Sequence, residues 1–452
     1  MRLTAFAVLL TIALFSAAQA QTPEIAFVNV TVVPMDQEHI LPRQTVIVKD
    51  GKIIAIGPAN KIKLPKDAQR IDGSSKYLMP GLADMHAHYA VSGTSPTESD
   101  DNKAFSLLFV ANGVTTVRNM WGTPGVLALR KQIDEGQVLG PRIFTTGPIN
   151  GTTRPNTRRV DTAEQGTAAV AADKREGYDA VKLTNPPKAA YDAIVAAARK
   201  EGLPVYGHVQ DEILLSHALE LRQDSIEHGG GFVVALQKKN APELRGRTQL
   251  LANVDWSLMP DIIAATRAAG TWVCPTLIAP QNSGTPEDTV RLLLNSSMKY
   301  IPRWLIESWA KAPPPVVNRL AYRDFNLKLV KALHDGGVGL LLGTDCLNPL
   351  IVPGFSIHEE LFSFVEAGLT PFQALKAGTS GAAEFLKRQE EFGTVVVGRR
   401  ADLILLEANP LTDVRNAAKR VGVMVRGHWF TEAELRDRLE KLAVFYSRSN
   451  SK

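Results

Sequence analysis

The stretch Met79-Pro-Gly-Leu-Ala-Asp84-Met-His86-Ala-His88 decides the fold, because it combines an apolar strand with polar residues at alternate positions. Successive side chains of a β-strand point to opposite faces, so Asp84, His86 and His88 share one face. Two imidazoles placed in this way can bind one borderline metal ion, and Asp84 can orient them from behind. A His-x-His pair is modest evidence by itself, so the rest of the chain must decide.

Outward from this stretch, short β-rich apolar runs alternate with helical stretches rich in Ala, Leu and Lys. This alternation is typical of repeated βα units that build a parallel sheet, and eight such units predict an α/β fold of the (β/α)8 TIM barrel type. The predicted strands are Leu78–His88, Val114–Asn119, Arg142–Gly147, Ala180–Leu183, Pro204–His208, Ser225–His228, Thr271–Thr276 and Gly339–Asp345. The predicted helices between them include Thr162–Glu176, Lys188–Glu201, Glu212–Leu221 and Asp261–Ala268.

Three further polar residues, His208, His228 and Asp345, end predicted strands. Polar side chains at the carboxyl ends of barrel strands converge on one mouth, where catalysis takes place in this fold. Packing alone is a poor explanation for histidines and a carboxylate at several strand ends. The pattern therefore predicts a metal site that includes these residues together with the two histidines of the first strand.

Lys182 lies within a predicted strand, on the face opposite Val181 and Leu183. A buried ammonium group without a partner is costly. Either the amine pairs with a carboxylate, or carbon dioxide modifies it to a carbamate whose negative charge could bridge two cations. The residues alone leave both alternatives open.

The run from about Ile25 to Phe430 resembles the metal-dependent amidohydrolase superfamily, in particular its imidazolonepropionase-like and prolidase-like members. Two departures are visible: Asn119 stands where this family commonly shows aspartate, and a tyrosine typical of carboxypeptidase-like members is missing after His228. The second departure argues against a dipeptidase. The stretches that carry the resemblance are Met79–His88, Gly113–Arg118, Gly140–Arg142, Val181–Lys182, Gly207–His208, Ser225–Gly229, Gly343–Asp345, Ala374–Thr379 and Gly398–Leu403.

The resemblance implies a two-metal site. On this reading His86, His88 and Asp345 bind one ion and His208 and His228 bind the other. Lys182 lies between them as a carboxylated, bridging ligand. The imidazole-rich ligand set favours zinc. His358, in the segment after the eighth strand, is a further candidate for contact with the substrate, although a helix-start or surface role fits equally well.

The expected activity is hydrolysis of an amide-type C–N bond in a small amide, cyclic amide, dipeptide or N-acyl amino acid. A metal-activated hydroxide would attack the carbonyl, with Asp345 as general acid and base. Three alternatives stay open: a hydrolase of esters or lactones, a catalytically inactive exported metal-containing binding protein, and a barrel that holds zinc for stability only. Structural zinc sites favour cysteine, and neither cysteine of this chain lies in a ligand pattern.

Two strand-rich clusters lie at opposite ends of the chain, and we expect them to form one small β-sandwich domain. In the first, Asp50-Gly51 is the turn pair of a tight hairpin, and Arg426-Gly427 is a plausible turn in the second. The insert from Ala279 to Val330 is too long for a simple loop and should overhang the barrel mouth. The predicted division is residues 1–20 signal peptide, 21–75 and 392–432 β-sandwich domain, 76–391 barrel, and 433–452 C-terminal helix or tail.

Residues 1–20 have the three parts of a secretory signal peptide: Arg2, the apolar run Leu3–Phe15 and the cleavage site Ala18-Gln19-Ala20. We therefore expect a periplasmic or secreted protein. Cys274 and Cys346 should be neighbours at the ends of the last two strands, and two small buried residues fit them better than a disulfide.

The 452 residues carry a net charge of +5 without a block of five or six like charges, which gives nucleic-acid binding little support. The expected partner is a small-molecule substrate, with no nucleic acid and no membrane after signal cleavage. A homo-oligomer is compatible with the sequence.

Overall fold

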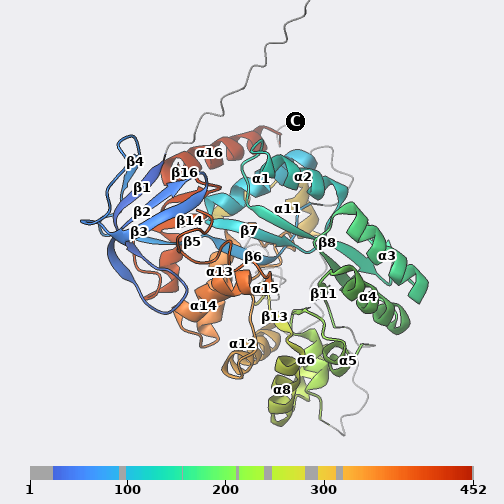
Figure 1. Ribbon diagram of the computed structural model, residues 1–452. Helices are drawn as coiled ribbons and strands as arrows, with labels where there is room; N and C mark the ends of the chain where they lie inside the picture. Colours follow the sequence, from blue (N-terminus) through green and yellow to red (C-terminus); the bar gives the residue numbers. More distant parts are fainter. Residues whose placement is uncertain are drawn as a thin grey trace, which may run out of the picture.

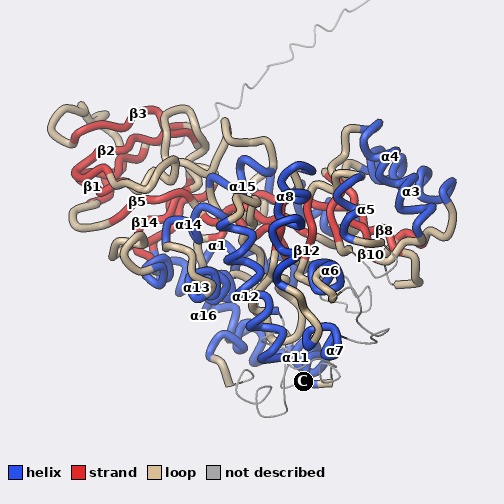
Figure 2. The backbone as a smooth tube through the Cα atoms, turned by 90° about the horizontal axis from the view of Figure 1, so that it is seen from below, coloured by secondary structure: helices blue, strands red, loops and turns tan. Residues whose placement is uncertain are grey.

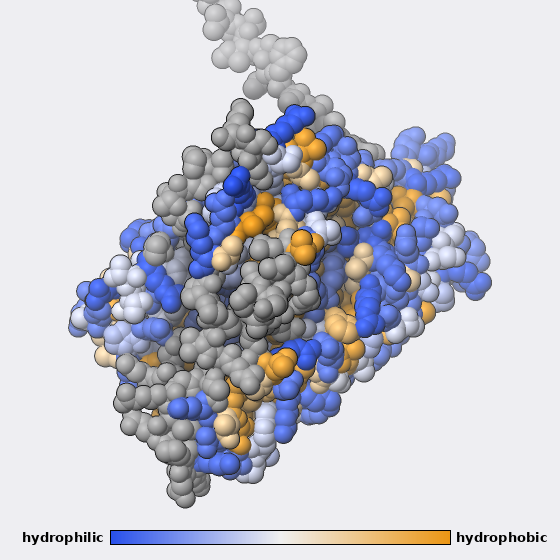
Figure 3. Space-filling model, turned by 180° about the vertical axis from the view of Figure 1, so that it is seen from behind, coloured by the Kyte–Doolittle hydropathy of each residue, from blue (hydrophilic) through white to orange (hydrophobic). Residues whose placement is uncertain are grey.

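The computed structural model describes residues 24–90, 98–154, 156–209, 213–238, 247–279, 294–311 and 319–449. The predicted signal peptide, and residues 280–293 and 312–318 of the predicted insert, lie outside these ranges. Among the described residues, no helix combines the length and the hydrophobicity that a membrane crossing requires. Figure 3 shows one face of the molecule, which is mostly hydrophilic with small, scattered groups of apolar residues.

Seven parallel strands form most of a barrel, in the same order along the sheet as along the chain (Figure 1). Each is short and mostly buried on both faces, as the alternation with helices predicts. The two-residue strand β9 (Arg158–Arg159) pairs with β8 outside this ring. The seven strands are β6 (Leu82–Ala87), β7 (Val114–Asn119), β8 (Arg142–Asn150), β10 (Ala180–Thr184), β11 (Val205–Gly207), β12 (Ser225–Glu227) and β13 (Trp272–Cys274).

The eighth predicted strand, Gly339–Asp345, is extended chain that makes a single ladder bridge, from Leu340 to Val273. It nevertheless closes the ring. Leu341 N donates to Val273 O of β13 at 2.9 Å, and Met85 N of β6 donates to Leu342 O at 2.8 Å. The barrel fold is therefore confirmed, with a last strand too irregular to continue the ladder.

The helices cover the outside of this ring, and several of them begin and end at residues typical of helix caps. In α3, Thr162 and Gln165 form a capping box, and Gly177 ends the helix at a φ of 87°. The α-helices are α1 (Glu98–Ala111), α2 (Pro124–Asp134), α3 (Ala163–Glu176), α4 (Lys188–Glu201), α5 (Leu215–Glu220), α6 (Gly230–Ala235), α7 (Arg247–Ala252), α8 (Met259–Ala269), α11 (Arg303–Ala310), α12 (Arg319–Asp335), α13 (Ser356–Glu366), α14 (Pro371–Ala377), α15 (Ser380–Phe385) and α16 (Glu432–Ser449). Short 3-10 helices are η1 (Trp256–Leu258), η2 (Ser296–Tyr300) and η3 (Val414–Ala418).

A second, mostly antiparallel sheet combines strands from both ends of the chain, as the two strand-rich clusters predict. Its order is β16-β15-β14-β5-β1-β2-β3, with β4 paired to β1. Figure 2 shows it apart from the barrel strands. The strands are β1 (Ile25–Val32), β2 (Leu41–Lys49), β3 (Lys52–Pro58), β4 (Gln69–Asp72), β5 (Tyr77–Pro80), β14 (Leu403–Leu406), β15 (Arg420–Val425) and β16 (His428–Thr431).

Both predicted hairpin turns of this sheet are present. Asp50 and Gly51 have φ values of 48° and 71°, and Arg426 and Gly427 have 55° and 78°. Positive φ at both central residues is the geometry of the type I′ turn that connects twisted strands. A Cβ on Gly427 would lie 2.5 Å from Gly51 Cα, so the two turns pack directly against each other.

The predicted strand Leu78–His88 is wrong in one respect, because it is divided between the two sheets. β5 pairs with β14 in the small sheet, whereas β6 pairs with β7 in the barrel. Pro80 has no N–H to continue a ladder, and Gly81 N donates instead to Asp402 O at 2.8 Å. The chain therefore crosses from the small sheet to the barrel at this Pro-Gly pair, immediately before the strand that carries His86.

Gly343 provides a test of the barrel closure. A Cβ at this position would lie 2.5 Å from Cys274 Sγ and 2.6 Å from His86 N, so the closing segment would have to move away from β6. We expect Gly343→Ala to lower the free energy of unfolding by about 1–3 kcal/mol in urea titrations. Gly230→Ala is the matched control, because a Cβ there has no neighbour within 4 Å. Equal stability of the two variants would contradict tight closure.

Candidate metal centre

One cavity of about 440 Å³ opens at the carboxyl ends of the barrel strands. It brings together all six residues that the sequence predicts as metal ligands, from five different places in the chain. Its remaining lining is largely aromatic or apolar. The cavity is lined by His86, His88, Tyr89, Ala90, Trp121, Arg154, Lys182, His208, His228, Trp304, Leu305, Asp345, Leu347 and Asn348.

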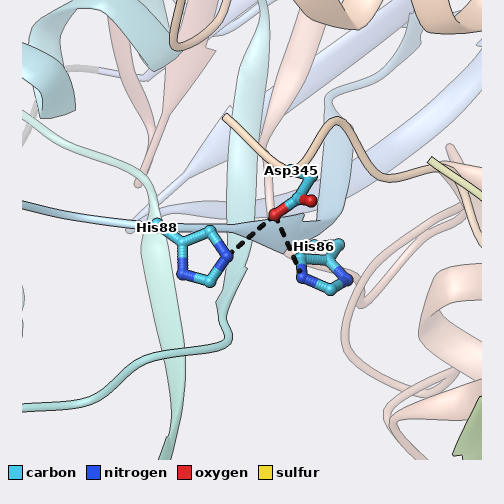
Figure 4. A group of neighbouring side chains, drawn as sticks. All are labelled: His86, His88 and Asp345. Atoms are coloured by element: carbon cyan, nitrogen blue, oxygen red, sulfur yellow. Dashed lines mark hydrogen bonds and ion pairs between the residues drawn. The ribbon is translucent and has the colours of Figure 1, made fainter. Parts of the chain in front are cut away.

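Asp345 is the centre of this cluster (Figure 4). Its Oδ1 lies 2.9 Å from His88 Nε2 and 3.3 Å from His86 Nε2, and its Oδ2 lies 3.8 Å from His228 Nε2. His86, His88 and Asp345 each offer a ligand atom within 4.8 Å of the others. This is the spacing that a single metal ion requires of three of its ligands.

The remaining predicted ligands surround this group. The ring centroids of His86 and His228 are 4.9 Å apart, and those of His208 and His228 are 5.0 Å apart. Lys182 Nζ lies 3.5 Å from His86 Nε2. The cluster therefore extends from β6 across to the ends of β11 and β12.

The hydrogen bonds at the back of the rings determine which nitrogen faces the cavity. His86 Nδ1 lies 2.7 Å from Glu227 Oε2, and a carboxylate can only accept, so His86 Nδ1 carries the proton. His228 Nδ1 lies 2.6 Å from Thr276 Oγ1. Each of these rings thus presents Nε2 to the cluster, which is the arrangement found around metal-bound histidines.

Glu227 orients the ring of His86, a role that the sequence analysis assigned to Asp84. Glu227 was not identified from the sequence. Asp84 shares a face with the histidines but does not contact their rings. Its carboxylate accepts from Thr344 N at 3.0 Å, from Thr344 Oγ1 at 2.7 Å and from His86 N at 3.3 Å. Asp84 lies two residues below His86 on the strand and therefore fixes the closing segment rather than the imidazole.

A fully buried arginine holds Glu227 in turn. Arg118 Nη2 donates to Glu227 Oε1 at 2.9 Å and to Oε2 at 3.0 Å, and neither side chain is exposed to solvent. Ser225 Oγ donates to Glu227 Oε1 at 2.5 Å. The guanidinium also lies 4.6 Å from the centre of the Tyr206 ring. Charge-assisted hydrogen bonds of this kind fix a carboxylate firmly.

Three buried members of the cluster, Asp345, His86 and Lys182, have pKa values below their usual range. Burial opposes ionisation of Asp345, but the charge of His86 and the hydrogen bond from His88 hold the pKa of Asp345 well below its usual value. Burial, helped by the charge of Lys182, lowers the pKa of His86 well below its usual value. Burial also lowers the pKa of Lys182. Metal ligands must be deprotonated, and all three shifts favour that form.

The backbone is strained at the residues that follow the strand ends. His228, Thr276 and Asp345 have φ values of 66°, 47° and 59°, a region that costs non-glycine residues about 1–3 kcal/mol each. Such strain persists only where the surroundings impose it. Here the backbone is held by the hydrogen bond between His228 Nδ1 and Thr276 Oγ1 and by the bond from Asp345 N to His86 O, both at 2.6 Å. The strain accompanies side chains that turn into the cavity.

The structure also shows where four other features of the sequence lie: His358, Asn119, the two cysteines and the insert. His358 lies on α13, where Arg420 Nη1 is 3.1 Å from its Nε2, and it does not line the cavity. Of the roles left open for His358, the structure shows the helix-start position, because His358 lies in the first turn of α13 and contacts Arg420 of the small sheet. Asn119, which departs from the family pattern, donates to Thr145 Oγ1 of the neighbouring strand at 2.9 Å. Cys274 and Cys346 are free and buried, as the sequence analysis expected. Part of the insert borders the mouth, since Trp304 and Leu305 line the cavity.

The model of the amidohydrolase family matches residues 77–430. Ochratoxinase of Aspergillus niger is 26% identical over 436 residues, with 85% of this chain and 81% of the relative covered. Imidazolonepropionase of a Geobacillus species is 25% identical over 394 residues, with 82% and 86% covered. The solved structure of a Xaa-Pro dipeptidase with bound methionine shares the fold, at 19% identity and a TM-score of 0.68, with 90% of this chain and 100% of that chain covered.

The contact between Glu227 and His86 can be tested by metal affinity. Glu227→Gln should weaken zinc binding about tenfold to a hundredfold, because the amide no longer fixes the tautomer of His86. Calorimetric titration of the metal-free protein with Zn²⁺ measures this change.

Asp173→Asn is the matched control for this variant. It breaks another pair between a buried carboxylate and an arginine, Arg158 with Asp173, on the outside of the barrel. The control should lose stability and keep its zinc affinity. Unchanged affinity in Glu227→Gln would show that the carboxylate does not orient the ligand.

Proposed function

This chain belongs to the amidohydrolase family, and from that premise we propose that it hydrolyses an amide-type C–N bond of a small molecule in the cavity around Asp345. The observation that carries the proposal is the convergence of His86, His88, His208, His228, Lys182 and Asp345 on one cavity wall. Six such side chains from distant parts of the chain would be costly to gather without a function. The matched relatives support the reaction class.

The donor set fits two divalent ions, for which we propose zinc. Imidazole nitrogens and a carboxylate are ligands that zinc accepts, and His86 and His228 already present Nε2. His86, His88 and Asp345 would hold one ion, and His208 and His228 the other. When bound, the ions would supply a hydrolytic water that ionises near neutral pH and would polarise the scissile carbonyl.

Lys182 would complete this site as a carbamate between the two ions. The amine is buried, and burial lowers its pKa, which raises the share of the neutral form. The neutral amine attacks carbon dioxide through its lone pair, forms the N–C bond and releases one proton. The product is an anion, which removes the cost of a buried cation beside the histidines.

Asp345 would transfer the protons of the reaction. Its low pKa keeps the carboxylate ionised, so it can accept a proton from the attacking water. The same oxygen would then return that proton to the leaving nitrogen as the C–N bond breaks. Trp304, Leu305 and Leu347 line the rest of the cavity and would exclude bulk water from this step.

The role of Asp345 leads to a prediction. Asp345→Asn should lower kcat for a hydrolysed amide by about a hundredfold to ten-thousandfold, because the proton acceptor is lost. Metal content, measured by elemental analysis, should remain close to that of the wild type, because the asparagine oxygen can still act as a ligand and the histidines stay in place. Retained activity in this variant would rule Asp345 out as the proton carrier.

A second prediction concerns Lys182. Activity restored to the metal-free protein by Zn²⁺ should increase with added bicarbonate, and intact-protein mass spectrometry under mild conditions should show the carbamate. Lys182→Gln should lose the dependence on bicarbonate. Full reactivation in carbonate-free buffer would leave Lys182 as an unmodified amine in an ion pair.

We also propose that the protein acts outside the cytoplasm, on the evidence of the first 20 residues. Expression of the full chain followed by N-terminal sequencing of the exported form should give Gln21 as the first residue. A product that keeps Met1 in the cytoplasmic fraction would contradict export.

A further inference from the structure

The C-terminal helix α16 is connected to the wall of the metal-site cavity through one buried carboxylate. Asp101 on α1 is 1% exposed. Its Oδ1 accepts from Tyr446 OH of α16 at 2.9 Å, and its Oδ2 accepts from Trp304 Nε1 of α11 at 2.9 Å. The three helices gather at the same side of the barrel in Figure 1. Asp101 therefore bonds the end of the chain and the described part of the insert at the same time.

A second contact joins α16 to the segment that precedes α11. Glu440 Oε1 lies 2.8 Å from Lys299 Nζ and accepts from Tyr300 OH at 3.4 Å. Lys299 and Glu440 are about half exposed, so this pair contributes little energy. The bonds to Asp101 are mostly shielded from water and are stronger for that reason.

The segment held in this way forms the apolar side of the cavity. Trp304 and Leu305 line it from α11, and Tyr89 and Leu347 line it from the barrel side. Trp309 Nε1 donates to Leu347 O at 3.2 Å, which connects α11 to the residues that follow Asp345. The polar cluster and this apolar wall thus face one space from different sides.

We propose that Asp101 is a positioning residue through which the C-terminal helix sets the apolar wall, and that this wall binds an aromatic ring or a similarly large apolar group beside the scissile amide. The proposal rests on the proposed function, because it assumes that substrates bind at the metal cluster. An aromatic and aliphatic wall gains free energy in proportion to the apolar surface that it removes from water. Small amides without such a group would contact only the polar side.

The geometry defines what a loss of the Tyr446 hydroxyl should do. Asp101 would lose one of its donors, and α11 would lose its bonded connection to the C-terminal helix. Trp304 would keep its bond to Asp101, but the carboxylate would no longer be fixed by a donor from α16, so Asp101 and Trp304 could shift together away from the ring of a bound ligand. The metal cluster does not contact Asp101, so the polar side of the cavity should stay as it is.

The test uses two hydroxamates as probes of the zinc-loaded full chain, measured by calorimetry. Acetohydroxamate reaches only the metal cluster, whereas benzohydroxamate adds a phenyl ring. In the wild type the ring should tighten binding about tenfold to a hundredfold. Tyr446→Phe and Asp101→Asn should each reduce this ring preference at least about fivefold and leave the acetohydroxamate Kd unchanged.

Lys299→Met is the matched control, because it breaks the exposed ion pair between Lys299 of η2 and Glu440 of α16 and leaves the bonds of Asp101 intact. Its ring preference should equal that of the wild type, and circular dichroism verifies that all variants are folded. A preference that survives in Tyr446→Phe and Asp101→Asn, or that falls equally in Lys299→Met, would overturn the role of Asp101. Equal affinity of the wild type for both probes would overturn the apolar wall. Failure of acetohydroxamate to bind would overturn the metal site itself, and this proposal with it.

Discussion

The hydrogen bonds that join the first barrel strand to the last one determine the chemistry of this molecule. Met85 N donates to Leu342 O, and Asp345 N donates to His86 O. Thr344 adds two bonds to Asp84 on the same seam. Through them a carboxylate 257 positions further along the chain comes within 2.9 Å of His88. Without this seam Asp345 would not reach the histidines of β6, and Glu227 would be the carboxylate left in contact with His86.

The fold and the gathering of the four histidines and Asp345 could be predicted from local signals, whereas the role of Lys182 was open from the residues and was implied by the family resemblance. Alternation along β6 predicts that His86 and His88 share a face, and the barrel rule predicts that strand ends meet. The alternation rule failed for Asp84, because it predicts the face on which a side chain lies but not which residue that side chain contacts along the strand. It also failed at Pro80, where the strand passes from one sheet to the other. For His358 the sequence left a substrate contact and a helix-start role open, because a helix that follows a strand end can turn toward either domain.

The residues that support the cluster were not predictable, because each depends on a partner far away in the chain. Arg118 and Glu227 are 109 positions apart, and Asp101 is 345 positions from Tyr446. A buried ion pair leaves no periodic pattern in the sequence, since its stability comes from geometry that only the folded barrel supplies. These residues form a layer that orients the ligands from behind and shapes the cavity from the side. In physical terms, the ligands could be read from the strands, whereas their preorganisation required the structure.

The central claim is that this cluster is a metal site with two ions, and anomalous X-ray diffraction from zinc-loaded crystals tests it most directly. Data collected on both sides of the zinc absorption edge should show two peaks in the cavity. One should lie between His86, His88 and Asp345, the other between His208 and His228, with density on Lys182 that joins them. A single peak would reduce the account to one ion. The absence of any peak at these residues, in crystals grown with excess zinc, would contradict it.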